Sequence, residues 1–119
     1  MKEGDVVLTP IPQADGAVKN RPAIILREMP PYGDFLVSGV STQLDKEVKG
    51  FDDVISSGDD DFNSSGLRTK SLIRLGFLAV LPSRQIIGTI GSLASTRHRK
   101  LLETLSNYLI QRDGDAADV

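Results

Sequence analysis

The chain has 119 residues, of which 39% are apolar and 25% charged, and its formal net charge is −2. This length suits one domain with its own core, and the absence of cysteine excludes disulfides, thiolate metal sites and cysteine nucleophiles. A single histidine excludes His-pair catalysis and multi-histidine metal centres. The chain has no apolar run long enough to span a membrane and no signal-like N-terminal stretch, so we expect a cytoplasmic protein without membrane contact.

The charges are unevenly distributed along the chain. Residues 45–61 hold seven acidic and two lysine residues, and residues 113–119 add three acids. The rest of the chain has 12 basic and 6 acidic residues. A basic body with acidic appendages would attract a phosphate backbone, although scattered solvated charges explain the same counts equally well.

The first half of the chain predicts three short strands. Asp5–Pro12 is rich in β-branched residues, Arg21–Arg27 follows a polar loop at Gln13–Asn20, and Phe35–Ser41 follows a turn at Met29–Asp34. Pro22 suits the first position of its strand. Short strands separated by turns favour an antiparallel sheet.

A long stretch rich in Asp, Ser and Gly, about residues 43–66, predicts an irregular acidic loop. Two strands at Ser71–Arg74 and Phe77–Leu81, separated by Gly76, and a short strand at Ile86–Ile90 should follow. Ser95–Gln111 predicts an amphipathic helix capped by Ser95, with Gly114 beyond its end. We therefore expect a single α+β, mainly β domain at residues 1–112, a small curled antiparallel sheet with a C-terminal helix, and a disordered acidic tail at 113–119.

Two charged regions suggest chemistry but have simpler interpretations. His98 lies beside Arg97, Arg99 and Lys100 in the first turn of the helix, where cations oppose the helix dipole and would meet an anion. We interpret this run as a solvated helix face. The triplet Asp59–Asp61 lacks the spacing of a calcium loop, so a charged, flexible cover is the better interpretation of the acidic segment, and no metal site is expected.

Arg21 and the pair Ser41-Thr42 form the candidate site. Arg21 stands where the polar loop enters a buried strand, and arginine offers a fork of donors that matches phosphate oxygens. Thr42 follows the third strand, and adjacent hydroxyls are useful at a phosphate. In a meander, the start of the second strand and the end of the third lie at the same end of the sheet. Arg21 and Thr42 should therefore converge.

Several segments in chain order resemble the MazF/PemK toxin family. They are Gly4-Asp5-Val6-Val7, then Arg21-Pro22-Ala23-Ile24-Ile25, the third strand ending in Ser41-Thr42, the segment Gly66-Leu67-Arg68-Thr69-Lys70-Ser71, and Ile90-Gly91-Ser92-Leu93 before the helix. The resemblance implies an SH3-like, MazF-type barrel that forms a homodimer, and it covers nearly the whole chain.

The resemblance also implies an activity. The family cleaves single-stranded RNA by attack of the RNA's own 2′-hydroxyl, without cofactor or metal, and is neutralised by a cognate antitoxin protein. By position, Arg21 matches its catalytic arginine and Thr42 its catalytic Ser/Thr. The implied RNA-binding residues are Gln13, Lys19, Asn20, Ser41, Arg68 and Ser71.

This chain departs from the family pattern in its long acidic segment and its low isoelectric point near 5.3. The leading hypothesis is a toxin endoribonuclease. One alternative is a non-catalytic toxin-like protein that acts on a protein target or sequesters an antitoxin. The gyrase-directed relatives carry a C-terminal tryptophan that this chain lacks. The other alternative is a small β-barrel interaction module in which Arg21 is structural.

Overall fold

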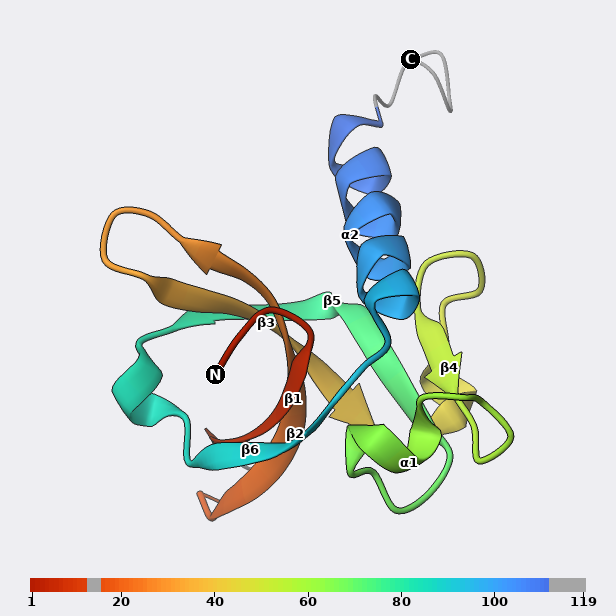
Figure 1. Ribbon diagram of the computed structural model, residues 1–119, viewed down its shortest axis with the longest axis horizontal. Coiled ribbons are helices and arrows are strands. Elements are labelled where there is room, and N and C mark those ends of the chain that lie inside the picture. Colours follow the sequence, from red (N-terminus) through yellow and green to blue (C-terminus); the bar gives the residue numbers. More distant parts are fainter. Residues whose placement is uncertain (13–15, 112–119) are drawn as a thin grey trace.

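The computed structural model describes residues 1–12 and 16–111, and its centre is a six-stranded sheet in the order β4-β5-β3-β2-β1-β6. Every neighbouring pair of strands is antiparallel. The strands are β1 (Asp5–Pro12), β2 (Val18–Met29), β3 (Asp34–Ser41), β4 (Asp53–Ile55), β5 (Ser71–Leu81) and β6 (Gly88–Ser92). The helices are η1 (Leu44–Lys46), α1 (Phe62–Ser65), η2 (Ser83–Gln85) and α2 (Ser95–Ile110). Figure 1 shows a curled sheet beside a C-terminal helix, which confirms the predicted fold class.

The central strand β2 sends its side chains alternately into two core clusters, because successive residues of a strand face opposite sides of the sheet. Ile24 and Leu26 enter the larger cluster, and Ala23 and Ile25 enter the smaller one. The larger cluster also contains Val6, Val40, Ile55, Phe62, Leu67, Ile73, Leu75, Leu93, Leu101 and Leu105, whereas the smaller contains Val7, Phe35, Val37 and Ile86. The curled sheet thus has one face against α2 and α1 and another that is covered more thinly.

Helix α2 (Ser95–Ile110) packs on the sheet through one side of the part that ends at Leu105. Leu101 and Leu105 are buried four residues apart, as the 3.6-residue period predicts. Tyr108, Leu109 and Ile110 are exposed at its end, and Figure 1 shows the C-terminal part of the helix extending beyond the sheet. The helix matches the predicted range to within one residue, but the predicted cap at Ser95 is wrong.

Strand β5 corrects the prediction of two strands separated by Gly76. Gly39 of β3 pairs with Arg74 while its neighbour Ser38 pairs with Leu78, so the register shifts across residues 75–77 and β5 continues. Such bulges bend a strand without ending it. A Cβ at Gly39 would lie 3.3 Å from the Phe77 ring, so a glycine suits this close contact.

The boundaries of two other strands differ from the predicted ones. Strand β2 begins at Val18 and ends at Met29, longer at both ends than the predicted Arg21–Arg27, because it pairs with β1 from Val18 onward and with β3 as far as Met29. Strand β6 begins at Gly88 rather than Ile86. Ile86 instead follows η2 and is buried in the smaller core cluster.

The prediction of an irregular stretch between residues 43 and 66 is wrong, since η1, β4 and α1 form within it. Strand β4 pairs with β5 at the edge of the sheet. Ile55 and Phe62 reach the larger core cluster and anchor the segment at two points. Apolar anchors on either side of an acidic triplet explain why this segment packs on the domain despite its charge.

Candidate functional site

The first residues of β2 and the last residues of β3 lie at the same end of the sheet, as the antiparallel meander predicts. The pairing of β2 with β3 ends at Ala23 and Gly39, and Arg21 and Ser41 each lie two residues beyond this last pair, at the same end of the sheet. On its other side Arg21 pairs with Thr9, whose hydroxyl donates a hydrogen bond to the Arg21 carbonyl at 3.4 Å. Arg21 is half-buried. Its backbone is thus fixed by pairing with β1.

Strand alternation separates the two candidate hydroxyls. Ser41 has the same parity as Gly39 and therefore faces the side of the sheet that Arg21 faces. Its Oγ accepts a hydrogen bond from the Gln43 amide at 3.0 Å, which fixes the turn after β3. Thr42 is exposed and lines a groove on the opposite face, beside Pro22.

That groove has a volume of about 360 Å³ and collects residues from five parts of the chain. It is lined by Leu8, Pro22, Thr42, Gly66, Leu67, Arg68, Thr69, Ser71 and Ile90. Three residues that the sequence singled out, Thr42, Arg68 and Ser71, are therefore brought together. Ser71 is buried and Arg68 is exposed, so the groove has a polar side chain at its base and a cation at its rim.

The remaining predicted residues have different positions. Lys19 and Asn20 are exposed at the start of β2, opposite Ile11 and Pro10 of β1. Gln13 lies outside the described residues, as does the predicted tail at 113–119. Sequence reasoning missed Leu8, Thr69 and Ile90 as groove residues. Thr69 stands inside the segment that was singled out, but Leu8 and Ile90 look like ordinary strand residues.

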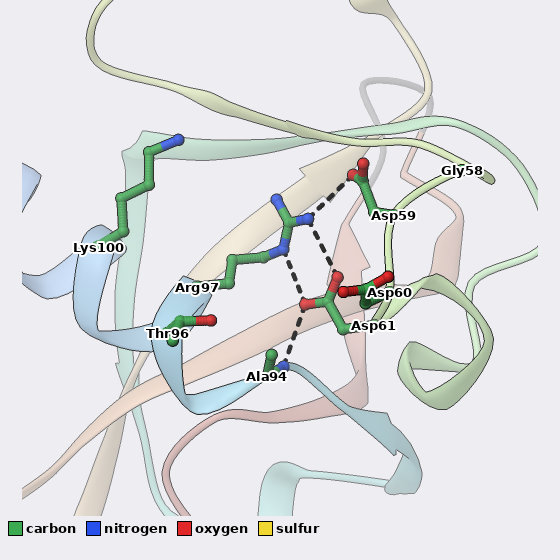
Figure 2. Close-up of a pocket in the computed structure, with 8 residues that line it drawn as sticks. All are labelled: Gly58, Asp59, Asp60, Asp61, Ala94, Thr96, Arg97 and Lys100. Atoms are coloured by element: carbon green, nitrogen blue, oxygen red, sulfur yellow. Dashed lines mark hydrogen bonds and ion pairs between the residues drawn. The ribbon is translucent and has the colours of Figure 1, made fainter.

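The acidic segment forms an ion cluster around Arg97 at the beginning of α2 (Figure 2). The guanidinium contacts Asp53 Oδ2 at 2.8 Å, Asp59 Oδ2 at 2.9 Å and Asp61 Oδ2 at 2.8 Å. Asp61 Oδ2 also accepts a hydrogen bond from the Ala94 amide at 3.0 Å. A carboxylate from a distant loop therefore caps α2 in place of the predicted serine.

The cluster shifts the ionisation of its members. Burial disfavours the charge on Arg97, but hydrogen bonds to Asp61 and Asp53 outweigh it and raise the pKa of the guanidinium. The hydrogen bond from Arg97 lowers the pKa of Asp61 despite partial burial. The hydrogen bond from the Ser56 amide, together with Arg97, lowers the pKa of Asp59. Arg97 thus favours the ionised forms of Asp59 and Asp61.

The interpretation of residues 97–100 as a solvated helix face is wrong for its first two members. The Arg97 side chain is only 14% exposed, and His98 Nε2 lies 2.8 Å from the Leu26 carbonyl oxygen, to which the imidazole donates. Arg99 and Lys100 are exposed as expected. The flexible-cover interpretation of residues 59–61 also fails, because Asp59 and Asp61 bind Arg97.

Across residues 1–12 and 16–111, no three His, Asp or Glu side chains are grouped so that they would hold a metal ion. None of the helices in these ranges combines the length and apolar character needed to cross a membrane.

Comparison with known proteins identifies the family. A family model described as "PemK-like, MazF-like toxin of type II toxin-antitoxin system" matches residues 2–109. Among solved structures, the Mycobacterium tuberculosis toxin MazF-mt6 is similar, with a TM-score of 0.64, 20% identity, and coverage of 91% of this chain and 98% of that chain. None of the curated proteins compared with the chain matches it. The structural likeness shows a shared fold, and the family match confirms the resemblance found in the sequence. The chain belongs to the PemK-like, MazF-like toxins of type II toxin–antitoxin systems.

Proposed function

We propose that this toxin is an endoribonuclease that cleaves single-stranded RNA without a metal. The observation that supports the proposal is the antiparallel pairing of β2 with β3, which brings the start of β2 with Arg21 and the end of β3 with Ser41 to the same end of the sheet. A groove lined by Thr42, Arg68 and Ser71 lies on the other face of this end. Family membership supports it, because the resemblance that led to the family implies this reaction. The chemistry needs neither a protein nucleophile nor a thiol, which suits a chain without cysteine.

In the proposed reaction the 2′-hydroxyl of the RNA attacks the neighbouring phosphorus, and the bond from phosphorus to the 5′-oxygen breaks. The 2′-hydroxyl loses its proton, and the leaving 5′-oxygen gains one. The products are a 2′,3′-cyclic phosphate and a 5′-hydroxyl end. Negative charge accumulates on the non-bridging oxygens in the transition state, so preorganised donors aimed at them would accelerate the reaction.

Arg21 is the main charge-stabilising residue in this proposal. A guanidinium stays protonated at neutral pH and presents donors in a planar fork, which suits two oxygens of one phosphate. Pairing of its strand with β1 and β3 fixes the backbone that carries it. A donor held in advance costs no reorganisation during the reaction.

A hydroxyl at the end of β3 supplies a second donor to the phosphate. The sequence pattern favours Thr42 for this role, whereas the register favours Ser41 because it lies on the same face as Arg21. Ser41 Oγ accepts a bond from Gln43 and keeps its own proton available for donation. We therefore assign the phosphate contact to the Ser41-Thr42 pair and distinguish the two members by substitution.

The acidic cluster around Arg97 shares no residue with the groove of the proposed RNA site. Asp53, Asp59 and Asp61 contact Arg97 at the beginning of α2, and Asp53 also contacts Lys100, so these two cations offset part of their charge there. Four basic residues belong to the segments that form the proposed RNA site. Lys19 and Arg21 lie at the start of β2, and Arg68 and Lys70 lie just before β5. A basic site attracts a phosphate backbone even when the net charge of the protein is negative.

The test is cleavage of a long single-stranded RNA in EDTA by the purified protein and by the Arg21→Ala variant. We expect the wild type to produce 5′-hydroxyl ends, which polynucleotide kinase labels without prior phosphatase treatment. We expect Arg21→Ala to lose about 100- to 1,000-fold in rate. The matched control is Arg27→Ala, an exposed arginine of the same strand that lies 3.7 Å from Glu3. A folded wild type that cuts no RNA would favour the non-catalytic binding protein.

We also propose a homodimer. Apolar side chains are exposed in the second half of β5 and after η2, at Phe77, Leu78, Val80 and Ile87, with exposed fractions between 39% and 55%. A second copy of the chain would cover them. Light scattering after size exclusion tests the assembly, and the double variant Phe77→Ser, Val80→Ser should shift it toward the monomer.

The cognate antitoxin is the other expected partner, because the family consists of toxins that act in toxin–antitoxin pairs. We propose that an acidic segment of the antitoxin occupies the RNA site and pairs with its cations. Antitoxin and an RNA oligonucleotide should then compete for the toxin, which a fluorescence polarisation titration measures.

A further inference from the structure

The groove beside Thr42 lies on the opposite face of the sheet edge from Arg21. Pro22 lines the groove, and Arg21 precedes it in the same strand, so their side chains point to opposite faces. A chain whose phosphate contacts Arg21 would cross the end of the sheet and bring an adjoining nucleotide to the groove. Arg21 and the groove residue Pro22 are consecutive residues of β2.

The walls of the groove suit a flat, partly apolar ligand with polar edges. Leu8, Pro22 and Ile90 provide apolar surface, while Thr42, Thr69 and Arg68 provide polar groups. A volume of about 360 Å³ lies at the small end of the range for ligand sites, roughly 300–1,000 Å³. The groove thus suits one heterocycle rather than two.

The polar groups have defined hydrogen-bonding directions. Ser71 donates its hydroxyl proton to the Thr69 carbonyl at 2.7 Å, so its oxygen has only lone pairs left for a ligand. Arg68 can only donate, and in the described part of the chain it forms no ion pair with a carboxylate. An acceptor at the base and a donor at the rim distinguish one base edge from another.

The groove is preformed by tight contacts behind it. A Cβ at Gly66 would lie 2.1 Å from the Ile90 carbonyl oxygen, so α1 ends directly against β6. Ser64 Oγ donates to the Ser92 carbonyl at 3.1 Å, and Ser65 Oγ accepts from the Leu67 amide at 3.1 Å. These bonds hold the segment that carries Arg68 and Thr69, so little ordering is needed on binding.

We propose that this groove receives one unpaired nucleobase next to the cleaved phosphate and prefers a base with an exocyclic amino group. Adenine, cytosine and guanine offer such a donor to Ser71 Oγ, whereas uracil has no exocyclic amino group and only its ring N3–H to donate. This proposal rests on the proposed ribonuclease function, and it assigns part of the sequence preference of the enzyme to Ser71 and Arg68.

The first experiment maps cleavage sites across a mixed RNA pool by end sequencing. Wild type should disfavour uracil at one position near the cut. Ser71→Ala should reduce that preference about fivefold, the worth of one hydrogen bond, with thermal unfolding as the check on folding. Arg68→Ala, an exposed substitution, should also change the base preference. The control Arg84→Ala, an exposed arginine of η2, should leave it unchanged.

A second experiment reads the groove without cleavage. The probe is a fully 2′-deoxy oligonucleotide with 2-aminopurine at the preferred position. Its fluorescence should increase when wild type or Arg21→Ala binds the base and removes it from the stacked strand. Arg68→Ala should weaken this binding at least fivefold. Brightening without any RNA cleavage by wild type would refute the ribonuclease and keep the base site. Cleavage with identical base preferences in wild type, Ser71→Ala and Arg68→Ala would overturn the base site alone.

Discussion

Arg97 Nε lies 2.8 Å from Asp61 Oδ2, and this same oxygen accepts the Ala94 amide at the beginning of α2. One carboxylate thus joins the acidic segment, the first turn of the helix and the guanidinium (Figure 2). Asp53 and Asp59 bind the other nitrogens of Arg97, and Asp53 also contacts Lys100 Nζ at 3.1 Å. The cluster fixes the edge strand β4 and α1 against α2.

Removal of Arg97 should therefore destabilise the whole domain. In Arg97→Ala three carboxylates lose their shared partner, and Asp53 and Asp61 are buried. Breaking a buried ion pair from one side costs about 3–5 kcal/mol in the free energy of unfolding. Urea denaturation measures this loss in the free energy of unfolding. Arg99→Ala, at an 81% exposed side chain paired with Glu103, should cost less than about 1 kcal/mol. Equal losses in the two variants would contradict a structural role for the cluster.

Acid should weaken the same cluster. The pKa of Asp61 is lower in the folded protein than the ordinary value of 3.8, because Arg97 donates to its carboxylate, so the folded state favours the ionised form. Its contribution to stability is fully present above pH 3.8 and is lost as the pH falls through the lower folded pKa. Asp61→Asn should lose stability at pH 7 and show a flatter decline below pH 4 than wild type. Thermal unfolding across a pH series measures this. Parallel curves for the two proteins would contradict the assignment to Asp61.

The two hydroxyls at the end of β3 should differ in their effect on cleavage. If the register governs the phosphate contact, Ser41→Ala should lower the RNA cleavage rate about 100-fold or more. Thr42→Ala should have a smaller effect on rate and a larger one on the choice of site, since Thr42 lines the groove. Single-turnover kinetics on one defined RNA separates these effects. A larger loss of cleavage rate in Thr42→Ala than in Ser41→Ala would assign the phosphate contact to Thr42.

Gly66 should not tolerate a side chain. Its φ is +76°, and a Cβ would approach the Ile90 carbonyl oxygen to 2.1 Å. The strained conformation alone costs about 1–3 kcal/mol for another residue, and the backbone contact adds to it. Gly66→Ala should therefore lower the melting temperature clearly, whereas Gly58→Ala should change it little, because a Cβ there meets no atom within 4 Å. Differential scanning calorimetry compares the two.

The sequence by itself determined the strands of the first half, the terminal helix and the family. Period-2 and period-3.6 apolar patterns are local, so β1, β3 and α2 appear at their predicted places within a residue or two. The ends of β2 and β3 were also predictable as neighbours, because short antiparallel connections leave few alternatives.

Only the tertiary structure decided the surroundings of Arg97, the continuity of β5 and the groove. The carboxylates that bind Arg97 lie 36 to 44 positions away in sequence, and a run of cations looks solvated until those partners are brought near. Gly76 looks like a break, but the register shift between β3 and β5 keeps the strand continuous. Leu8 and Ile90 become groove residues only when β1, β6 and the segment before β5 meet. Contacts between distant segments have no local periodicity, so packing alone reveals them.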